Sequence, residues 1–233
     1  MSAIVLFMAG IAAIAGWWLS QQRLTAKPWL EEGTIGDLPG AGSSLLVAKI
    51  GLGVFLAVVS SLFALVISAY SMRADLADWR TVPIPTLLWF NTGMLVVSSV
   101  SLQLAQVAAR REDRDGMITG LLSGGVSAVT FLAGQLLAWQ QLRNAGYFLA
   151  GNPANSFFYL ITGLHGLHLL GGLVALGRTI VKAFGGLALP QLRLSVELCT
   201  MYWHFLLLVW LILLGLLTGS VDDFLKICRQ VLG

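Results

Sequence analysis

The sequence predicts an all-α, polytopic transmembrane bundle of six helices. Hydrophobic residues make up 57% of the 233-residue chain and charged residues only 11%, whereas soluble domains carry about 25% charged residues. The mean hydropathy is +0.83. Six windows free of charged residues each reach the roughly 20 residues that a helix needs to cross the hydrocarbon layer. These windows run from Met1 to Gln22, Ile50 to Met72, Thr81 to Ala109, Gly116 to Leu142, Asn144 to Gly177 and Leu198 to Val221.

The first window contains an unbroken apolar run from Ala3 to Leu19. No Lys or Arg precedes this run, whereas a secretory signal peptide begins with a positively charged region. Trp17 and Trp18 lie at its end, where interfacial aromatic residues are common. We therefore expect a retained helix. The predicted organisation is an N-terminal helix with its connecting loop, residues 1–45, followed by a five-helix bundle, residues 46–233.

The fifth window is longer than a single crossing requires. Its GNPAN stretch, Gly151 to Asn155, has the composition of a turn. We therefore expect the fifth helix to begin near Ser156. Each of the other windows is predicted to contain one helix.

Basic residues are unevenly divided between the two sides of this topology. Nine lie in the first, third and fifth connections, and five lie on the opposite side. Because cytoplasmic connections carry the excess of Lys and Arg, the larger group is predicted to be cytoplasmic and both termini to face outward. The net charge of +3 suits basic residues beside anionic lipid and gives no sign of nucleic-acid binding. The nine are Arg23, Lys27, Lys49, Arg110, Arg111, Arg114, Arg178, Lys182 and Arg193.

Two of the three histidines, His165 and His168, lie in the apolar stretch ITGLHGLHLLGG. At this spacing they share one helix face, with Thr162 one turn earlier. Histidine can ligate metal, but haem or copper would need further ligands, and His204 is the one other histidine. We favour buried, hydrogen-bonded rings over lipid or proton contact, and a metal site is the weakest interpretation.

The stretch ELCTMYWHFLLLVW places Glu197 and His204 on one helix face, two turns apart. Glu197 could hold an imidazole of the fifth helix and favour its charged form, or it could be a solvated interfacial charge, and both interpretations stay open. Tyr202 and Trp203 are amphipathic aromatic residues of the kind that pack or anchor.

The third window, with the stretch LLWFNTGMLVVSSVSLQLAQ, is rich in hydrogen-bonding side chains. Such groups hold transmembrane helices together at about 0.6–2 kcal/mol per contact, so we expect Asn91, Thr92 and the serines to be packing groups. No acidic residue lies within a helix core, which argues against a proton or cation transporter. The RREDRDG run is predicted to be a solvated loop that caps the third and fourth helices.

From about Lys49 to Ser220 the chain resembles the cytochrome c oxidase subunit III family, which is subunit III of the haem–copper oxidases. The motifs are, in order, KIGLGVF, LWFNTGMLVVSS, EDRDGM, FLAGQLLAW, SFFYLITGLHGLHLLGG and ELCTMYWHFLLLVW. The chain looks like the shorter bacterial variety, because one helix rather than two precedes the five that match. The matching positions are Asn91, Thr92, Gln135, Thr162, His165, His168, Glu197, Tyr202, Trp203 and His204.

The resemblance implies a subunit that holds no haem, copper or electron itself. Such a subunit packs beside catalytic subunit I, with subunit II as a further partner, in an oxidase that reduces O₂ to water while pumping protons. It binds phospholipid, supports proton uptake and protects the enzyme from turnover-linked inactivation. Haem and copper are expected in the partner subunits, and the location implied is the bacterial cytoplasmic membrane.

Three acids that are usual in the family are absent from this sequence. Val59, Ala138 and Leu207 stand at their positions, and Trp139 replaces a neighbouring tyrosine. These replacements weaken the inference that the chain acts as a proton antenna, and they favour a structural, lipid-holding role. An accessory protein of nitric oxide reductase is the main alternative function. An independent transporter is a weaker alternative, because we see no inverted repeat.

A polar girdle is expected between the last two helices. We predict that His165, His168, Glu197 and His204 form it and fix these helices against each other. A buried polar group that loses its partner costs about 1–3 kcal/mol, so such a girdle should matter for assembly.

Overall fold

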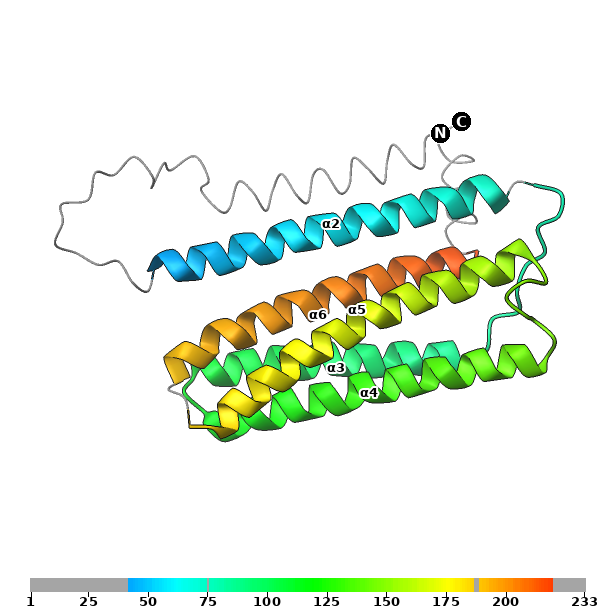
Figure 1. Ribbon diagram of the computed structural model, residues 1–233. Helices are drawn as coiled ribbons and strands as arrows, with labels where there is room; N and C mark the ends of the chain where they lie inside the picture. The colour runs from blue at the N-terminus through cyan, green and yellow to red at the C-terminus, as the bar shows by residue number, and fades with distance from the viewer. Residues whose placement is uncertain (1–41, 75, 187–188, 220–233) are drawn as a thin grey trace, which may run out of the picture. The chain divides into compact units, whose positions relative to one another are not determined.

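The computed structural model describes residues 42–74, 76–186 and 189–219 and contains five α-helices (Figure 1). Each is long and apolar enough to cross a membrane, and the described ranges contain no strand. The prediction of an all-α, multi-pass membrane protein is therefore confirmed. The expected helix Ala3–Leu19 lies outside the described residues. The five helices are α2 (Gly42–Ala74), α3 (Leu87–Arg110), α4 (Arg114–Asn144), α5 (Pro153–Phe184) and α6 (Leu189–Leu217).

The chain divides into two compact units, Met1–Ser61 and Leu62–Gly233. The first unit contributes the described part of α2 up to Ser61. There the hydroxyls of Ser60 and Ser61 donate to carbonyls one turn earlier in the same helix, which satisfies them inside an apolar segment. The second unit holds the end of α2 and all of α3 to α6, and every contact described below lies within it.

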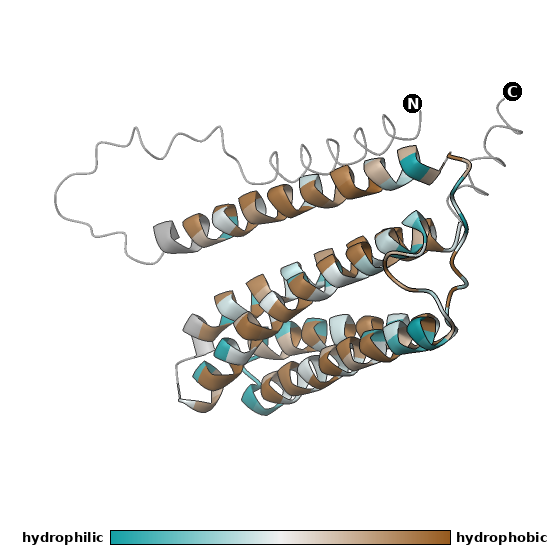
Figure 2. Cartoon of the chain, turned by 45° about the vertical axis from the view of Figure 1, so that its right-hand side comes forward, coloured by the Kyte–Doolittle hydropathy of each residue, from teal (hydrophilic) through white to brown (hydrophobic). Residues whose placement is uncertain are grey.

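In the second unit, helices α3, α4, α5 and α6 pack as a closed ring. α3 lies against α4 and α6, and α5 lies against the same two helices. Hydrophobic residues extend along these helices, while hydrophilic residues gather towards their ends (Figure 2). Outward-facing side chains such as Leu104, Val126 and Val174 are exposed and apolar, which suits contact with lipid tails.

Small residues of α4 bring its backbone close to α3. A Cβ atom on Gly120 would lie 2.8 Å from the Ser101 carbonyl oxygen and 2.9 Å from the Ala105 nitrogen. A Cβ on Gly124 would lie 3.3 Å from the carbonyl oxygen of Ser98. The Ser98 hydroxyl uses this proximity and donates to the Gly124 carbonyl at 2.7 Å. Because Gly120 and Gly124 of α4 have no side chains, the Ser98 hydroxyl of α3 can reach the backbone of α4.

The fifth helix begins at Pro153, earlier than the expected start near Ser156. The Asn152 side chain caps it by accepting a hydrogen bond from the Ala154 amide at 3.3 Å. Proline at the first helical position sacrifices no intrahelical bond, because that amide would have no partner in the helix. The GNPAN stretch therefore contains both the turn and the first residues of the helix.

The charge-free windows mark depth in the membrane better than they mark helix ends. α6 begins at Leu189, before the window, because helical structure continues through Arg193 and Glu197. α3 begins only at Leu87, later than its window. Pro83 and Pro85 in that stretch lack the amide hydrogens that a helix interior needs.

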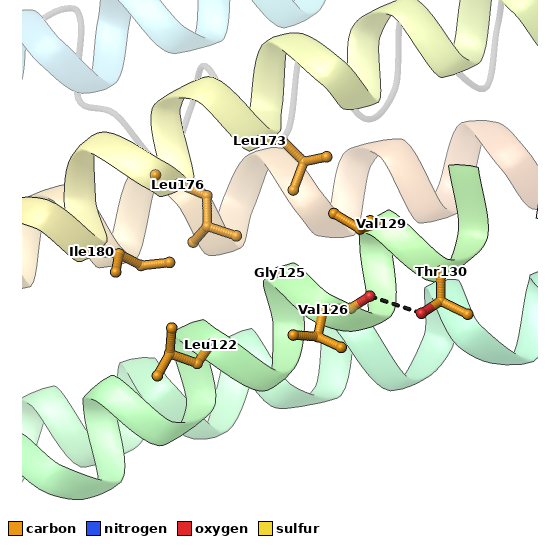
Figure 3. Close-up of a pocket in the computed structure, with 9 residues that line it drawn as sticks. Leu122, Gly125, Val126, Val129, Thr130, Leu173, Leu176 and Ile180 are labelled. Carbon is orange, nitrogen blue, oxygen red and sulfur yellow. Dashed lines mark hydrogen bonds between the residues drawn. The ribbon is translucent and has the colours of Figure 1, made fainter. Parts of the chain in front are cut away.

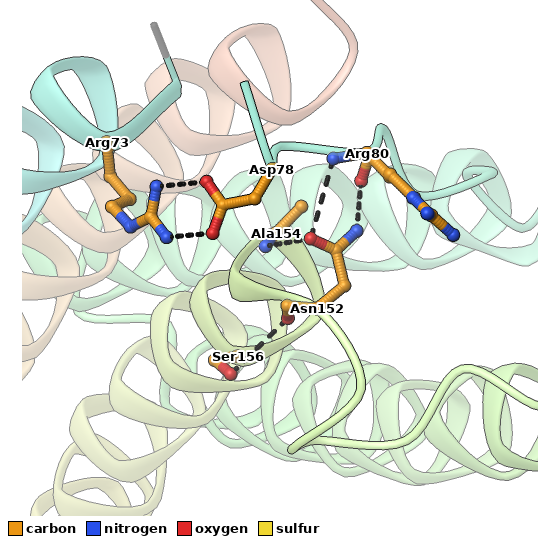
Figure 4. A network of polar contacts seen from close by, with 6 residues as sticks. All are labelled: Arg73, Asp78, Arg80, Asn152, Ala154 and Ser156. Carbon is orange, nitrogen blue, oxygen red and sulfur yellow. Dashed lines mark hydrogen bonds and ion pairs between the residues drawn. The ribbon is translucent and has the colours of Figure 1, made fainter. Parts of the chain in front are cut away.

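The connection between α2 and α3 is tied to the start of α5 (Figure 4). Asn152 accepts a hydrogen bond from the Arg80 amide at 3.4 Å and donates its own amide to the Arg80 carbonyl. The guanidinium of Arg73, in the last turn of α2, donates to both carboxylate oxygens of Asp78 in the connection. These bonds lower the pKa of Asp78 below its ordinary value.

Candidate functional site

His165 lies at the centre of the helix ring. It is fully buried, and its Nε2 atom donates to the Leu206 carbonyl of α6 at 3.1 Å. Its ring centroid lies 5.7 Å from that of Phe131 on α4 and 5.0 Å from that of Trp210 on α6. His165 therefore joins α5 to both neighbouring helices, as a packing residue would.

His168 faces a different neighbour, although it lies one turn from His165. Its Nδ1 atom donates to the Leu164 carbonyl of its own helix at 2.8 Å, and its ring lies 5.4 Å from that of Phe63. Its backbone carbonyl accepts the Tyr202 hydroxyl at 2.9 Å. The contact between α5 and α6 at this level is therefore made by Tyr202 and not by the imidazole.

The position of His204 contradicts one part of the predicted polar girdle between the last two helices. Its two ring nitrogens contact the Ser99 hydroxyl and, at 3.0 Å, the carboxamide oxygen of Gln103. Both of these residues belong to α3. His204 thus links α6 to α3, whereas we expected it to fix α6 against α5.

Glu197 lies near the start of α6 and is half-buried. Its near neighbour Cys199 contacts the Thr179 hydroxyl of α5, with 3.6 Å between sulfur and oxygen. Tyr202, further along α6, is the residue that meets His168. Glu197 therefore lies nearer the start of α6 than the residue that meets His168, and both interpretations of its side chain stay predictions.

Three indole groups reach hydroxyls on neighbouring helices. Each of these hydroxyls also donates to a backbone carbonyl, so it is satisfied both as acceptor and as donor. The sequence indicated the hydroxyls but did not reveal their partners. The bonds join Trp203 to Ser98 at 2.7 Å, Trp210 to Thr92 at 2.9 Å and Trp139 to Thr162 at 3.0 Å.

Asn91 and Gln135 are buried carboxamides on α3 and α4, with exposed fractions of 0% and 4%. Neither has a hydrogen-bond partner among the described residues. Asn91 occupies the notch left by Gly134, where an added Cβ would lie 1.9 Å from its Oδ1 atom. Both side chains therefore lie in the interior between the helices.

An apolar groove of about 380 Å³ runs between α4 and α5 (Figure 3). Its polar side chain, Thr130, donates its hydroxyl to the Val126 carbonyl at 2.9 Å and so satisfies itself within the helix. The groove therefore offers an apolar wall and no free hydrogen-bonding side chain. The other lining residues are Leu122, Gly125, Val129, Leu173, Leu176, Gly177 and Ile180.

The loop between α3 and α4 does more than the sequence indicated. As predicted, it caps α4, because the Asp113 side chain accepts from the Gly116 amide at 3.0 Å. In addition, Arg193 of α6 donates to Glu112 at 2.9 Å and to the Ala109 carbonyl at 3.0 Å. The loop thus holds the ends of three helices together.

Residues 49–217 match the family model described as cytochrome c oxidase subunit III. The chain belongs to the cytochrome c oxidase subunit III family. The match includes α3 to α6 in full and most of α2, so the resemblance drawn from the motifs is confirmed. Family membership supports its being a subunit of a haem–copper oxidase.

Individual relatives agree with the family match. A probable cytochrome c oxidase subunit 3 from Nocardia farcinica is 27% identical over 170 residues, 71% of this chain and 84% of that protein. The cytochrome c oxidase subunit 3 of Thermostichus vulcanus is 31% identical over 176 residues, 72% of this chain and 85% of that protein. A probable subunit 3 from Mycobacterium tuberculosis is 31% identical over 122 residues, 52% of this chain and 60% of that protein.

The three histidines of this subunit III chain are directed to three different sets of neighbours. Among the described residues, no group of three His, Cys, Asp or Glu side chains gathers as metal ligands would. The expectation that this chain itself holds no metal or haem stays a prediction.

Proposed function

We propose that this chain is a non-catalytic membrane subunit of a bacterial haem–copper terminal oxidase, which stabilises catalytic subunit I and holds phospholipid. One observation carries the proposal: polar side chains at the family positions serve to pack helices. The indole–hydroxyl bonds of Trp203 and Trp210 join α6 to α3, and His165 joins α5 to α6. A chain built in this way is suited to present a rigid surface to a partner.

The α4–α5 groove supports the lipid-holding part of the proposal. Its apolar lining suits an acyl chain, which needs no hydrogen bonds. Arg178 and Lys182, both exposed, lie at the same end of α5 as Ile180 of the groove, but each is two residues from Ile180 and so projects from another face of the helix. We propose a phospholipid with one acyl chain in the groove and its headgroup at this basic end of α5.

A structural role fits this chain better than a proton-collecting one. Val59, Ala138 and Leu207 replace acids that are usual in the family, and Ala138 is fully buried in the bundle. Haem, copper and the reduction of O₂ are assigned to the partner subunits. We place the subunit in the bacterial cytoplasmic membrane with both termini outward, as the distribution of basic residues predicts.

The decisive test is affinity purification of the tagged chain from its native membrane in mild detergent, followed by haem spectra and subunit identification. We expect haem–copper oxidase subunits I and II in the purified complex. Nitric oxide reductase subunits in their place would support the alternative function. Purification of the chain alone would overturn assignment to an oxidase.

The lipid site is tested by filling the groove. A Cβ on Gly177 meets no atom within 4 Å, so Gly177→Leu should occupy the groove without disturbing the helices. Gly171→Leu on the same helix is the matched control, since it too has open space but does not line the groove. Mass spectrometry of the purified complex should show lipid lost from the first variant only. Equal lipid content in both variants would refute the site.

A further inference from the structure

The connection between α4 and α5, residues 145–152, contains no charged residue. It belongs to the uncharged stretch 144–177, which is longer than one crossing needs, since α5 itself begins only at Pro153. The α3–α4 connection is built differently, because its residues 111–113 are all charged and exposed. The composition of the α4–α5 connection is therefore that of a membrane segment and not that of a solvated loop.

Three consecutive backbone carbonyls of this connection, those of residues 147–149, each accept a hydrogen bond from a side chain in the first two turns of α5. In a solvated loop, water would satisfy such carbonyls. In the apolar part of a membrane, every backbone polar group needs a partner within the protein, and this arrangement supplies one to each carbonyl. The bonds run from Tyr159 Oη to Tyr147 at 2.9 Å, from Asn155 Nδ2 to Phe148 at 3.0 Å and from Ser156 Oγ to Leu149 at 2.6 Å.

The connection holds two large apolar side chains on the outside of the bundle. Phe148 and Leu149 are 60% and 59% exposed. The helices on either side also expose leucines towards this end, Leu137 on α4 and Leu160 on α5. Two side chains are far less than the roughly 800 Å² per partner that a specific protein interface buries, whereas lipid borders every transmembrane bundle. Lipid is therefore the neighbour that this small apolar surface fits.

Aromatic residues indicate the depth of the connection. Tyr159, which bonds to it, packs edge-to-face on Trp139 of α4, with 5.7 Å between ring centroids. At the same end of the bundle (Figure 1), Tyr70 packs on both Trp79 and Phe157. Because Trp and Tyr are enriched at the boundary between hydrocarbon and water, the connection lies at the depth of this boundary.

We propose that the α4–α5 connection is embedded in the lipid bilayer, with Phe148 and Leu149 inserted beside the glycerol groups and upper acyl chains of the leaflet at this end. Its paired carbonyls remove the main cost of placing backbone there, and its two apolar side chains gain from leaving water. The connection thus anchors the ends of α4 and α5 at a fixed depth. This anchoring needs only the membrane-spanning helices, whichever complex the chain joins.

Fluorescence quenching tests the depth of the connection. The full chain, with the subunits that co-purify, is placed in nanodiscs of phosphatidylcholine and phosphatidylglycerol, after Cys199 and Cys228 have been replaced by serine. A nitrobenzoxadiazole dye is attached to Leu149→Cys, and Arg111→Cys in the charged α3–α4 connection is the control. We expect lipids with a nitroxide near the glycerol to quench the dye at position 149, and aqueous iodide to leave it unquenched. The control should show the reverse.

Two other results would overturn the proposal. Iodide quenching at position 149 equal to that at position 111 would show a solvated connection. Protection from both quenchers would show that protein covers it, whether another subunit, a second copy or residues 220–233 of this chain. Phe148→Cys, labelled separately, must give the same result as Leu149→Cys, so the conclusion does not depend on one variant.

A second measurement tests the paired carbonyls. Tyr159→Phe removes the donor to the Tyr147 carbonyl, and Tyr147→Phe is the matched control, since it removes a hydroxyl and leaves that bond in place. Opening of the connection is followed by hydrogen exchange at the Phe148 amide, which donates to the Gly146 carbonyl at 3.2 Å. We expect exchange to accelerate by about two- to twelve-fold in Tyr159→Phe, the range that corresponds to one lost hydrogen bond. Equal exchange in the two variants would mean that water satisfies the carbonyl, and the connection would not be embedded.

Discussion

Trp210 donates its indole N–H to the Thr92 hydroxyl at 2.9 Å and thereby joins the last helix to α3. The Thr92 hydroxyl in turn donates to the Leu88 carbonyl at 2.8 Å, so it is satisfied both as a hydrogen-bond acceptor and as a donor. Trp210 also packs edge-to-face on Phe131, with 5.0 Å between ring centroids. One residue therefore combines polar and aromatic contacts with two different helices.

Replacing Trp210 with phenylalanine should keep much of the aromatic packing and remove the hydrogen bond. We expect the free energy of unfolding to fall by about 0.5–1.5 kcal/mol from the lost bond, and by more where the smaller ring leaves a cavity. Unfolding of the purified subunit in mixed micelles measures the change. Trp89→Phe, at a position 62% exposed, is the control and should have little effect. Equal stability of the two variants would contradict the role given to Trp210.

Gly120→Ala should disturb the contact between α3 and α4. The new Cβ would meet backbone atoms of Ser101 and Ala105 at 2.8 and 2.9 Å, and backbone cannot move aside as a flexible side chain can. We expect a loss of about 1–3 kcal/mol in the free energy of unfolding. Gly93→Ala is the matched control, because a Cβ there has no neighbour within 4 Å. If both variants unfold at the same detergent concentration, the close helix approach does not exist.

Asn152 has two separable tasks, which two substitutions distinguish. Asn152→Ala removes the cap of α5 and both bonds to Arg80, and should cost about 0.5–2 kcal/mol from the cap alone. Asn152→Asp keeps the acceptor oxygen for the Ala154 amide and loses only the donation to the Arg80 carbonyl. Hydrogen exchange at the Ala154 amide should therefore accelerate in the alanine variant and stay slow in the aspartate variant. Equal acceleration in both would rule out capping by the side-chain oxygen.

The ion pair of Arg73 and Asp78 should make the α2–α3 connection sensitive to acid. The folded state lowers the pKa of Asp78, so the pair stabilises the connection above the unfolded pKa, about 3.9 for aspartate. This contribution is lost as the pH falls through the lower, folded pKa. We expect hydrogen exchange in residues 76–80 to accelerate over this acidic range in the natural chain. Asp78→Asn should remove that pH dependence, and its persistence in the variant would assign it to another group.

The number and approximate place of the described helices followed from the sequence because the hydrocarbon layer excludes charge. The helix ends did not follow, since a helix continues into the interfacial zone, where charge is tolerated. Glu197 lies inside α6 although it comes directly before a charge-free window and is not part of it. Pro153 begins a helix within a stretch whose composition indicates a turn, because its missing amide has no cost at the first position.

The polar residues of the candidate site could be identified as packing groups, but their partners could not. Spacing along one helix shows which residues share a face, and it carries no information on the register between helices. For this reason His204 was expected beside α5 and lies against Ser99 and Gln103 of α3. The indole donors were missed for the same reason, because each is far in sequence from the hydroxyl that it meets.

The Ser98 hydroxyl accepts a hydrogen bond from Trp203 of α6 and donates one to the Gly124 carbonyl of α4. These two helices lie opposite each other in the ring, each packed on α3 and α5 rather than broadly on one another. One oxygen atom thus links the position of α6 to that of α4, in addition to the ring contact between Trp210 and Phe131. Because bonds in such a chain strengthen one another, the two helices should loosen together, and the ring should come apart in a single step instead of shedding its last helix first.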